Sequence, residues 1–124
     1  MWEESNYGDN HQGFCLCFET EFDKSFFSGI EKVKYSFDKK NKPEIVFNST
    51  KFNDQIQKYI FSKSKDLFWE EEYRLLKMKI GLHFFQKNSL TEIILGKEMT
   101  PDNKDKIKQI VKTSNYKNVF ITEN

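Results

Sequence analysis

The sequence predicts an α+β protein with a mostly antiparallel sheet and two main helices. Several short stretches alternate apolar and polar residues, which is typical of strands with one buried face. Two longer stretches, residues 50–61 and 101–113, place apolar residues at helical spacing. The chain contains no internal repeat or low-complexity segment, and its 124 residues predict a single domain with a real core.

The first predicted strand covers residues 13–20. Its centre, Phe14–Phe18, is apolar on both faces and follows Gly13, which predicts a strand buried on both sides and central in its sheet. Asp23 can then cap a short helical turn over residues 24–28.

The next part of the chain predicts two strands and a helix. Residues 33–37 alternate apolar with polar side chains, as in a strand with one wet face, and residues 44–47 form another short strand. Ser49 or Thr50 caps the helix over residues 50–61. The buried stripe of this helix comprises Phe52, Ile56, Tyr59 and Ile60.

The second half predicts more strands and a helix. A polar link at residues 62–65 precedes a strand over residues 72–80. A turn at residues 87–89 then leads into a strand over residues 90–95, and we expect the two strands to form a hairpin. Thr100 and Pro101 start the helix over residues 101–113, and residues 118–122 form the last strand. The buried face of that helix comprises Ile107, Ile110 and Val111.

Charge and cysteine usage exclude several function classes. The formal net charge is +1, from 20 basic and 19 acidic residues spread along the chain, so nothing indicates binding to nucleic acid or to an anionic membrane. Cys15 and Cys17 lie on one face of a strand, where they favour small buried hydrophobes over a disulfide or a metal site. Without a membrane span or a signal peptide, the default expectation is a cytoplasmic protein.

Arg74 is the only arginine beside nineteen lysines. Every other basic side chain that carries a permanent positive charge is a lysine. The exception at Arg74 indicates a position that needs a planar bidentate donor for a carboxylate or a phosphate. Two interpretations stay open: a structural ion pair with a neighbouring glutamate, or a clamp for an anionic ligand.

Acidic side chains and a histidine supply candidate acid/base groups. Glu70 and Glu72 share a face of an extended chain with Arg74, and their mutual repulsion would raise the pKa of one carboxyl unless Arg74 locks them as an ion pair. His11, in a loop before the first strand, suits proton transfer near neutral pH, or else hydrogen-bonds its turn together with Asp9.

Metal and nucleotide-loop motifs are weak or missing. The sequence has no His/Cys cluster at zinc-ligand spacing and no glycine-rich phosphate loop, and no pattern identifies a cofactor. A magnesium ion held by Glu70 and Glu72 is the one metal alternative.

Three motifs occur in order along the chain: residues 7–13 running into 14–18, residues 70–75, and residues 93–96. Together they resemble the bacterial DUF2971 family, whose function is unknown. The resemblance implies that the characteristic family positions are Tyr7, His11, Gly13, Glu70, Glu72, Tyr73 and Arg74.

This sequence departs from the family pattern in places. Trp2 stands farther from Tyr7 than the pattern expects, and Leu67 replaces a tryptophan before the acidic motif, with Trp69 nearby. Family members also have an upstream segment that this sequence lacks. We therefore expect residues 1–124 to be the C-terminal part of a longer DUF2971-like domain.

Two function classes follow, and the sequence leaves open whether the protein is an enzyme. In the first, an enzyme-like pocket binds an anionic small molecule or nucleotide, with catalytic roles for His11, Glu70 and Glu72 and ligand contacts from Tyr7, Tyr73 and Arg74. Nucleotide processing or ADP-ribosyl transfer is its specific form. In the second, the protein is a non-catalytic binding or interaction module, or an inactive fragment. Self-association through the apolar strand at residues 14–18 is expected in addition.

Overall fold

The computed structural model describes residues 8–38, 41, 44–47 and 50–124. The α+β class with two main helices is confirmed. The chain divides into two compact units, one built from residues 8–28 with 81–124 and the other from residues 29–80. The prediction of a single domain over residues 1–124 is not tested by this division and stays a prediction.

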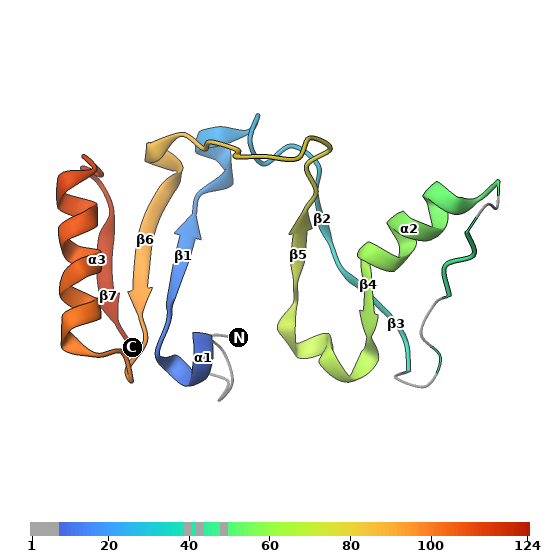
Figure 1. The fold of residues 1–124 in the computed structure, drawn as a ribbon, viewed down its shortest axis with the longest axis horizontal. Helices are drawn as coiled ribbons and strands as arrows, with labels where there is room; N and C mark the ends of the chain where they lie inside the picture. The colour runs from blue at the N-terminus through green and yellow to red at the C-terminus, as the bar shows by residue number, and fades with distance from the viewer. Residues whose placement is uncertain (1–7, 39–40, 42–43, 48–49) are drawn as a thin grey trace. The chain divides into compact units, whose positions relative to one another are not determined.

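The first unit is built around a three-stranded sheet in the order β1-β6-β7 (Figure 1). Strand β1 runs antiparallel to β6, and β7 runs parallel to β6. In chain order the elements are α1 (Gly8–His11), β1 (Phe14–Phe18), the 3-10 helix η1 (Thr20–Asp23), the 3-10 helix η4 (Lys87–Ser89), β6 (Leu90–Leu95), α3 (Pro101–Thr113) and β7 (Phe120–Glu123).

The centre of this sheet is β6, and the prediction that the strand at residues 13–20 would be central is wrong. Strand β6 pairs on both sides and carries Leu95, which is fully buried, whereas β1 pairs with β6 alone among the described strands. Two apolar side chains of β1 are consequently half exposed, Phe14 at 49% and Leu16 at 40%. An apolar run on both faces thus marks an edge strand here.

Helix α3 covers one face of the sheet. The Thr100 hydroxyl accepts a hydrogen bond from the Asn103 amide, which confirms the predicted helix start. Ile107 and Val111 pack on the core, but Ile110 is 59% exposed, contrary to expectation. A sheet of three strands is narrow, so only a thin stripe of the helix finds apolar cover. The buried core comprises Leu90, Ile93, Leu95 and Met99.

Asp23 joins two distant stretches of this unit. Its Oδ1 accepts a hydrogen bond from the Phe26 amide at 3.0 Å, and its Oδ2 accepts one from the Gln86 amide at 2.7 Å. The predicted capping role is therefore confirmed, although residues 24–29 form turns and not a regular helix. Phe18, Phe26, Phe27 and Phe85 pack ring against ring beside it.

The second unit contains two short two-stranded ladders and one helix. Strands β2 and β5 pair antiparallel, and β3 and β4 pair parallel. In chain order the elements are β2 (Ile30–Lys32), β3 (Lys34–Phe37), α2 (Phe52–Ile60), β4 (Ser62–Ser64), the 3-10 helix η3 (Lys65–Glu70) and β5 (Tyr73–Leu75).

Several predicted boundaries differ in this unit. The strand expected at residues 33–37 is present as β3 but begins one residue later; buried Val33 lies between β2 and β3, and its backbone amide donates to the Glu72 carbonyl at 2.8 Å. Residues 44–47 form no strand, since the Val46 amide donates to the Gln55 side chain. The expected polar link at residues 62–65 instead contributes β4, because its two buried serines alternate with Lys63 along the strand.

Helix α2 begins later than predicted and is less buried. Its N-cap position is Lys51 without a side-chain cap, so Thr50 does not cap it, and Ser49 lies outside the described residues. The predicted apolar stripe is half buried, and no residue of the helix is fully buried. Neither α2 nor any other helix in the described part of the chain is long and apolar enough to cross a membrane.

Strand β5 is much shorter than the predicted strand over residues 72–80. Its partner β2 begins at Ile30, which lies opposite Leu75, so the chain beyond Leu75 has no strand to pair with in this ladder. Apolar side chains at alternate positions beyond Leu75 are exposed to solvent, Met78 at 91% and Ile80 at 107%. The expected hairpin with residues 90–95 does not form, since β6 pairs with β1 and β7.

Candidate functional site

Four charged side chains of the second unit form one network. Lys63 comes from β4, Glu70 ends η3, Glu72 directly precedes β5 and Arg74 lies within β5. The side chains are only partly exposed, from 10% for Glu70 to 30% for Arg74. Two cations and two anions thus balance in a partly desolvated position, where ion pairs are stronger than at an open surface.

Arg74 forms three hydrogen bonds through its planar guanidinium group. Its Nε donates to Glu72 Oε1 at 2.6 Å and its Nη2 donates to Glu72 Oε2 at 3.0 Å, while Nη1 donates to the Ile60 carbonyl. A lysine has a single ammonium group and cannot reproduce this bidentate pair together with the backbone contact. The single arginine of the chain therefore stands where the geometry of the donor matters.

Lys63 connects the two carboxylates. Its ammonium donates to Glu70 Oε2 and, at 3.1 Å, to Glu72 Oε2. Between them, Glu71 takes a left-handed conformation with φ 45°, which turns the chain from η3 toward β5. The sequence predicted that Glu70 and Glu72 would share one face of an extended strand, and the structure brings them to one cation through this turn.

The ion pairs shift the pKa values of Glu72 and Lys63. The hydrogen bond from Arg74 holds the pKa of Glu72 below its usual value, against the opposing effect of burial. Burial lowers the pKa of Lys63, but hydrogen bonds to Glu70 and Glu72 outweigh it and the net shift is upward. The pKa of Glu72 thus moves opposite to the rise expected from two repelling carboxylates, in line with the alternative of a locked ion pair.

A small cavity of about 240 Å³ adjoins the network. Its lining combines the two cations with two aromatic side chains and a serine, namely Phe37, Tyr59, Ser62, Lys63 and Arg74. The Tyr35 hydroxyl accepts a hydrogen bond from the Glu72 amide at 2.9 Å. The cavity therefore offers N–H donors and ring surfaces side by side.

Tyr73 does not belong to this cavity. Side chains of successive strand residues point to opposite faces, so Tyr73 lies on the face opposite Arg74. It is 58% exposed, and the Lys32 ammonium sits 5.8 Å from its ring centroid. The predicted ligand role of Tyr73 gains no support from its position.

His11 occupies a left-handed turn of the first unit. Residues 8–11 all have positive φ, with 65° at His11, a conformation that glycine, aspartate, asparagine and histidine tolerate better than most residues. The His11 carbonyl accepts the Glu98 amide at 3.1 Å, and the Gly13 amide donates to the Gly8 carbonyl at 2.6 Å. His11 is 6% exposed, so the interpretation that this loop is a structured turn fits its geometry.

The structure thus brings together three of the six predicted site residues. Glu70, Glu72 and Arg74 share the network of the second unit, whereas His11 belongs to the first unit and Tyr7 lies outside the described residues. Sequence reasoning missed Lys63, which it placed in a polar link. The alternation of Ser62, Lys63 and Ser64 could have indicated a strand with the lysine on one face.

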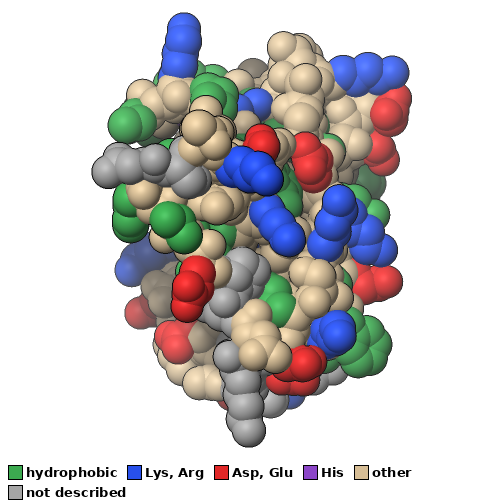
Figure 2. Space-filling model, turned by 90° about the vertical axis from the view of Figure 1, so that its right-hand side faces the viewer, with side chains coloured by type: hydrophobic (Ala, Val, Ile, Leu, Met, Phe, Trp, Pro, Cys, Tyr) green, Lys and Arg blue, Asp and Glu red, His purple; other side chains and the backbone are tan. Residues whose placement is uncertain are grey.

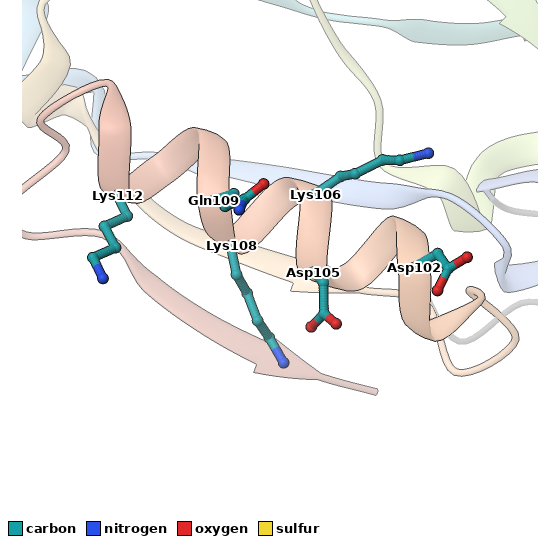
Figure 3. A pocket seen from close by; sticks show the side chains of 6 residues that line it. All are labelled: Asp102, Asp105, Lys106, Lys108, Gln109 and Lys112. Carbon is teal, nitrogen blue, oxygen red and sulfur yellow. The ribbon is translucent and has the colours of Figure 1, made fainter.

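The surface along helix α3 is less suited to binding than the cavity beside the network. A hollow of about 560 Å³ runs along α3, but its lining side chains come from one helix and spread apart (Figure 3). On the face drawn in Figure 2, basic and acidic side chains are interspersed, so no patch of one sign marks it. The side chains along α3 are Asp102, Asp105, Lys106, Lys108, Gln109 and Lys112.

Metal ligands and relatives give no further guide. Within the described ranges, no three His, Cys, Asp or Glu residues gather as metal ligands. The two thiols of Cys15 and Cys17 are free, and burial, with smaller contributions from Cys15 and Glu92, raises the pKa of Cys17 to about 11.

Comparisons with protein-family models, with curated proteins and with solved structures find no match.

Proposed function

We propose that residues 29–80 form a non-catalytic binding module for the anionic end of a small molecule or nucleotide. The observation that carries the proposal is the cavity in which Lys63 and Arg74 adjoin Phe37 and Tyr59. A guanidinium group and an ammonium group are the side-chain groups that bind carboxylates and phosphates through charge-assisted hydrogen bonds. The aromatic rings supply apolar walls for a planar group.

The carboxylates argue against acid/base catalysis in this cavity. A general acid or base works best with a pKa near the operating pH, and the pKa of Glu72 is shifted downward by Arg74. Glu70 is buried and bonded to Lys63. Both carboxylates therefore hold the cations in position for a ligand, which makes them positioning groups. Catalytic roles for His11, Glu70 and Glu72 stay untested predictions.

The size of the cavity limits the ligand. Pockets for drug-sized molecules measure roughly 300–1,000 Å³, and this one measures about 240 Å³. It accommodates one ring or one phosphate group of a larger ligand. A mononucleotide would be held by one end, with the remainder outside.

The proposal also covers the cellular location, the family and the self-association of the protein. A cytoplasmic location fits the two free thiols of Cys15 and Cys17, which persist in a reducing compartment. A DUF2971-like identity rests on the sequence motifs described above. Self-association fits the half-exposed apolar side chains of β1.

The test is titration of the 15N-labelled protein with adenosine monophosphate, adenosine and inorganic phosphate, followed by NMR. We expect shifts confined to residues around the cavity, with the monophosphate binding more tightly than adenosine. Tyr59→Leu should weaken its binding about tenfold, in line with ~1–3 kcal/mol for stacking on an aromatic ring. Tyr73→Leu, the same change at an exposed site of the same unit, should leave the affinity unchanged.

Two results would count against the proposal. One is the absence of any shift with all three probes at millimolar concentration. The other is equal weakening by Tyr59→Leu and Tyr73→Leu, since the cavity would then not be the place of binding.

A further inference from the structure

Strand β1 lies at an edge of the described sheet, and its sequence has none of the residues that usually protect an edge strand. Among the strands that the structure describes, it pairs only with β6. Its five residues include no lysine, no proline and no charge, the features with which proteins commonly prevent an edge from pairing with another chain. The bulge in the ladder places its extra residue in β6, at Thr91, so β1 itself stays regular.

The sequence of β1 is a palindrome, Phe14-Cys15-Leu16-Cys17-Phe18. Two antiparallel copies aligned on Leu16 place each residue opposite an equivalent partner. Phe14 then lies opposite Phe18 of the second copy, and Leu16 lies opposite itself. Such self-complementarity is what a two-fold interface requires, because both copies contribute the same patch.

The backbone of β1 supports the same register. The Gly13 carbonyl accepts the Gly96 amide, so Gly13 bonds toward β6. Because backbone groups alternate sides along a strand, Cys15 and Cys17 also face β6, whereas Phe14, Leu16 and Phe18 direct their N–H and C=O groups to the other edge. In the aligned pair, Leu16 and the Phe14 and Phe18 positions become hydrogen-bonded pairs, and Cys15 meets Cys17 in a non-hydrogen-bonded pair.

We propose that this chain forms a symmetric dimer through antiparallel pairing of β1 with β1 of a second copy, aligned on Leu16. The two three-stranded sheets then join into one continuous sheet. The half-exposed Phe14 and Leu16 side chains, at 49% and 40%, gain apolar neighbours from the second copy. A five-residue pairing is small for an interface, so we expect a dissociation constant on the order of tens of micromolar.

The first test is sedimentation equilibrium over a wide range of protein concentration. The wild-type chain should shift from monomer to dimer. Leu16→Lys should weaken dimerisation at least tenfold, because two like charges would lie directly opposite each other. Ile110→Lys, the same kind of change at a 59% exposed position of α3, should alter it less than twofold. Circular dichroism confirms that each variant is folded.

The second test fixes the register by oxidative cross-linking with copper-phenanthroline in the presence of oxygen. As two thiols form a disulfide they release two protons to the solvent and two electrons, which pass through Cu(II) to oxygen. Facing residues of a non-hydrogen-bonded pair have side chains close enough for this bond. Cys15→Ser and Cys17→Ser should each give no covalent dimer alone, since the remaining thiol faces serine. A mixture of the two variants should give covalent dimer, because Cys17 of one then meets Cys15 of the other.

Three outcomes would overturn the proposal. A clean monomer at millimolar concentration excludes the dimer. Unchanged dimerisation of Leu16→Lys places the interface elsewhere. Cross-linking of either single variant alone, as efficient as that of the mixture, shows a different register or non-specific association through the edge.

Discussion

Replacing Arg74 with lysine tests the central contact of the charged network. Lysine keeps the positive charge and one contact with Glu72, so the change isolates the geometry of the guanidinium. It removes the second N–H bond to the Glu72 carboxylate and the bond to the Ile60 carbonyl. Under the ion-pair interpretation, the variant should be less stable than the wild type.

The magnitude follows from the two bonds lost. Each hydrogen bond to a charged group contributes about 1.5–3 kcal/mol when well buried. The two side chains are 30% and 29% exposed, so water compensates part of the loss. We expect Arg74→Lys to lower the free energy of unfolding by about 2 kcal/mol. Glu72→Gln should cost a similar amount.

Urea denaturation provides the measurement. In a Trp2→Phe background, fluorescence reports Trp69, which lies in the same unit as Arg74. A double-mutant cycle with Arg74→Lys and Glu72→Gln should show coupling of at least 1 kcal/mol, in the range of residues that share one network (about 0.5–3 kcal/mol). A loss below about 0.3 kcal/mol for Arg74→Lys, or additive effects of the two changes, would refute the reasoning. A stable variant that no longer binds adenosine monophosphate would assign Arg74 to the ligand instead.

Three further predictions concern backbone contact, capping and pH. A Cβ on Gly96 would lie 2.0 Å from the His11 carbonyl oxygen, so Gly96→Ala should destabilise the protein by about 3 kcal/mol or more in thermal or urea unfolding; an effect below 1 kcal/mol would contradict this contact. Asp23→Asn replaces one of two acceptor oxygens with a donor and should cost about 2 kcal/mol in the same assay, and a neutral effect would show that the two backbone bonds contribute little. Because the pKa of Glu72 is lowered on folding, its ion pair stabilises the protein above the ordinary pKa of 4.5, and this stabilisation is lost as pH falls through the pKa of the folded state. Glu72→Gln should therefore flatten the fall of unfolding free energy at acid pH. Glu71→Gln, at an exposed position, should leave this fall steeper than in Glu72→Gln.

Elements with local signals were predictable from the sequence. The start of α3 is encoded by Thr100 and Pro101, and β6 by an apolar run after a polar turn. These signals act within a few residues, so the sequence contains them in full. The ion pair of Glu72 with Arg74 was predictable for the same reason, because residues two apart on a strand share a face.

Features that depend on distant partners were not predictable. An apolar run such as Phe14–Phe18 indicates that both faces avoid water but not whether a second strand flanks it. Strand β5 ends at Leu75 because β2 supplies no partner beyond Ile30, although the alternating pattern continues to Ile80. Lys63 joined the network through the parallel pairing of β3 with β4; the alternation of Ser62, Lys63 and Ser64 could indicate a strand, but not which strand pairs with it.

The division of the chain has a consequence for the order of folding. The second unit, residues 29–80, is inserted between the two segments that form the first unit. Within the insert, Ile30 lies opposite Leu75, so its folding brings its own entry and exit close together. The loop that closes when β1 pairs with β6, residues 19–89, is thereby shortened to residues 19–30 and 75–89. By loop-closure entropy this eases the docking of β1 on β6 by roughly 1 kcal/mol, and it favours folding of the insert before closure of the sheet around it.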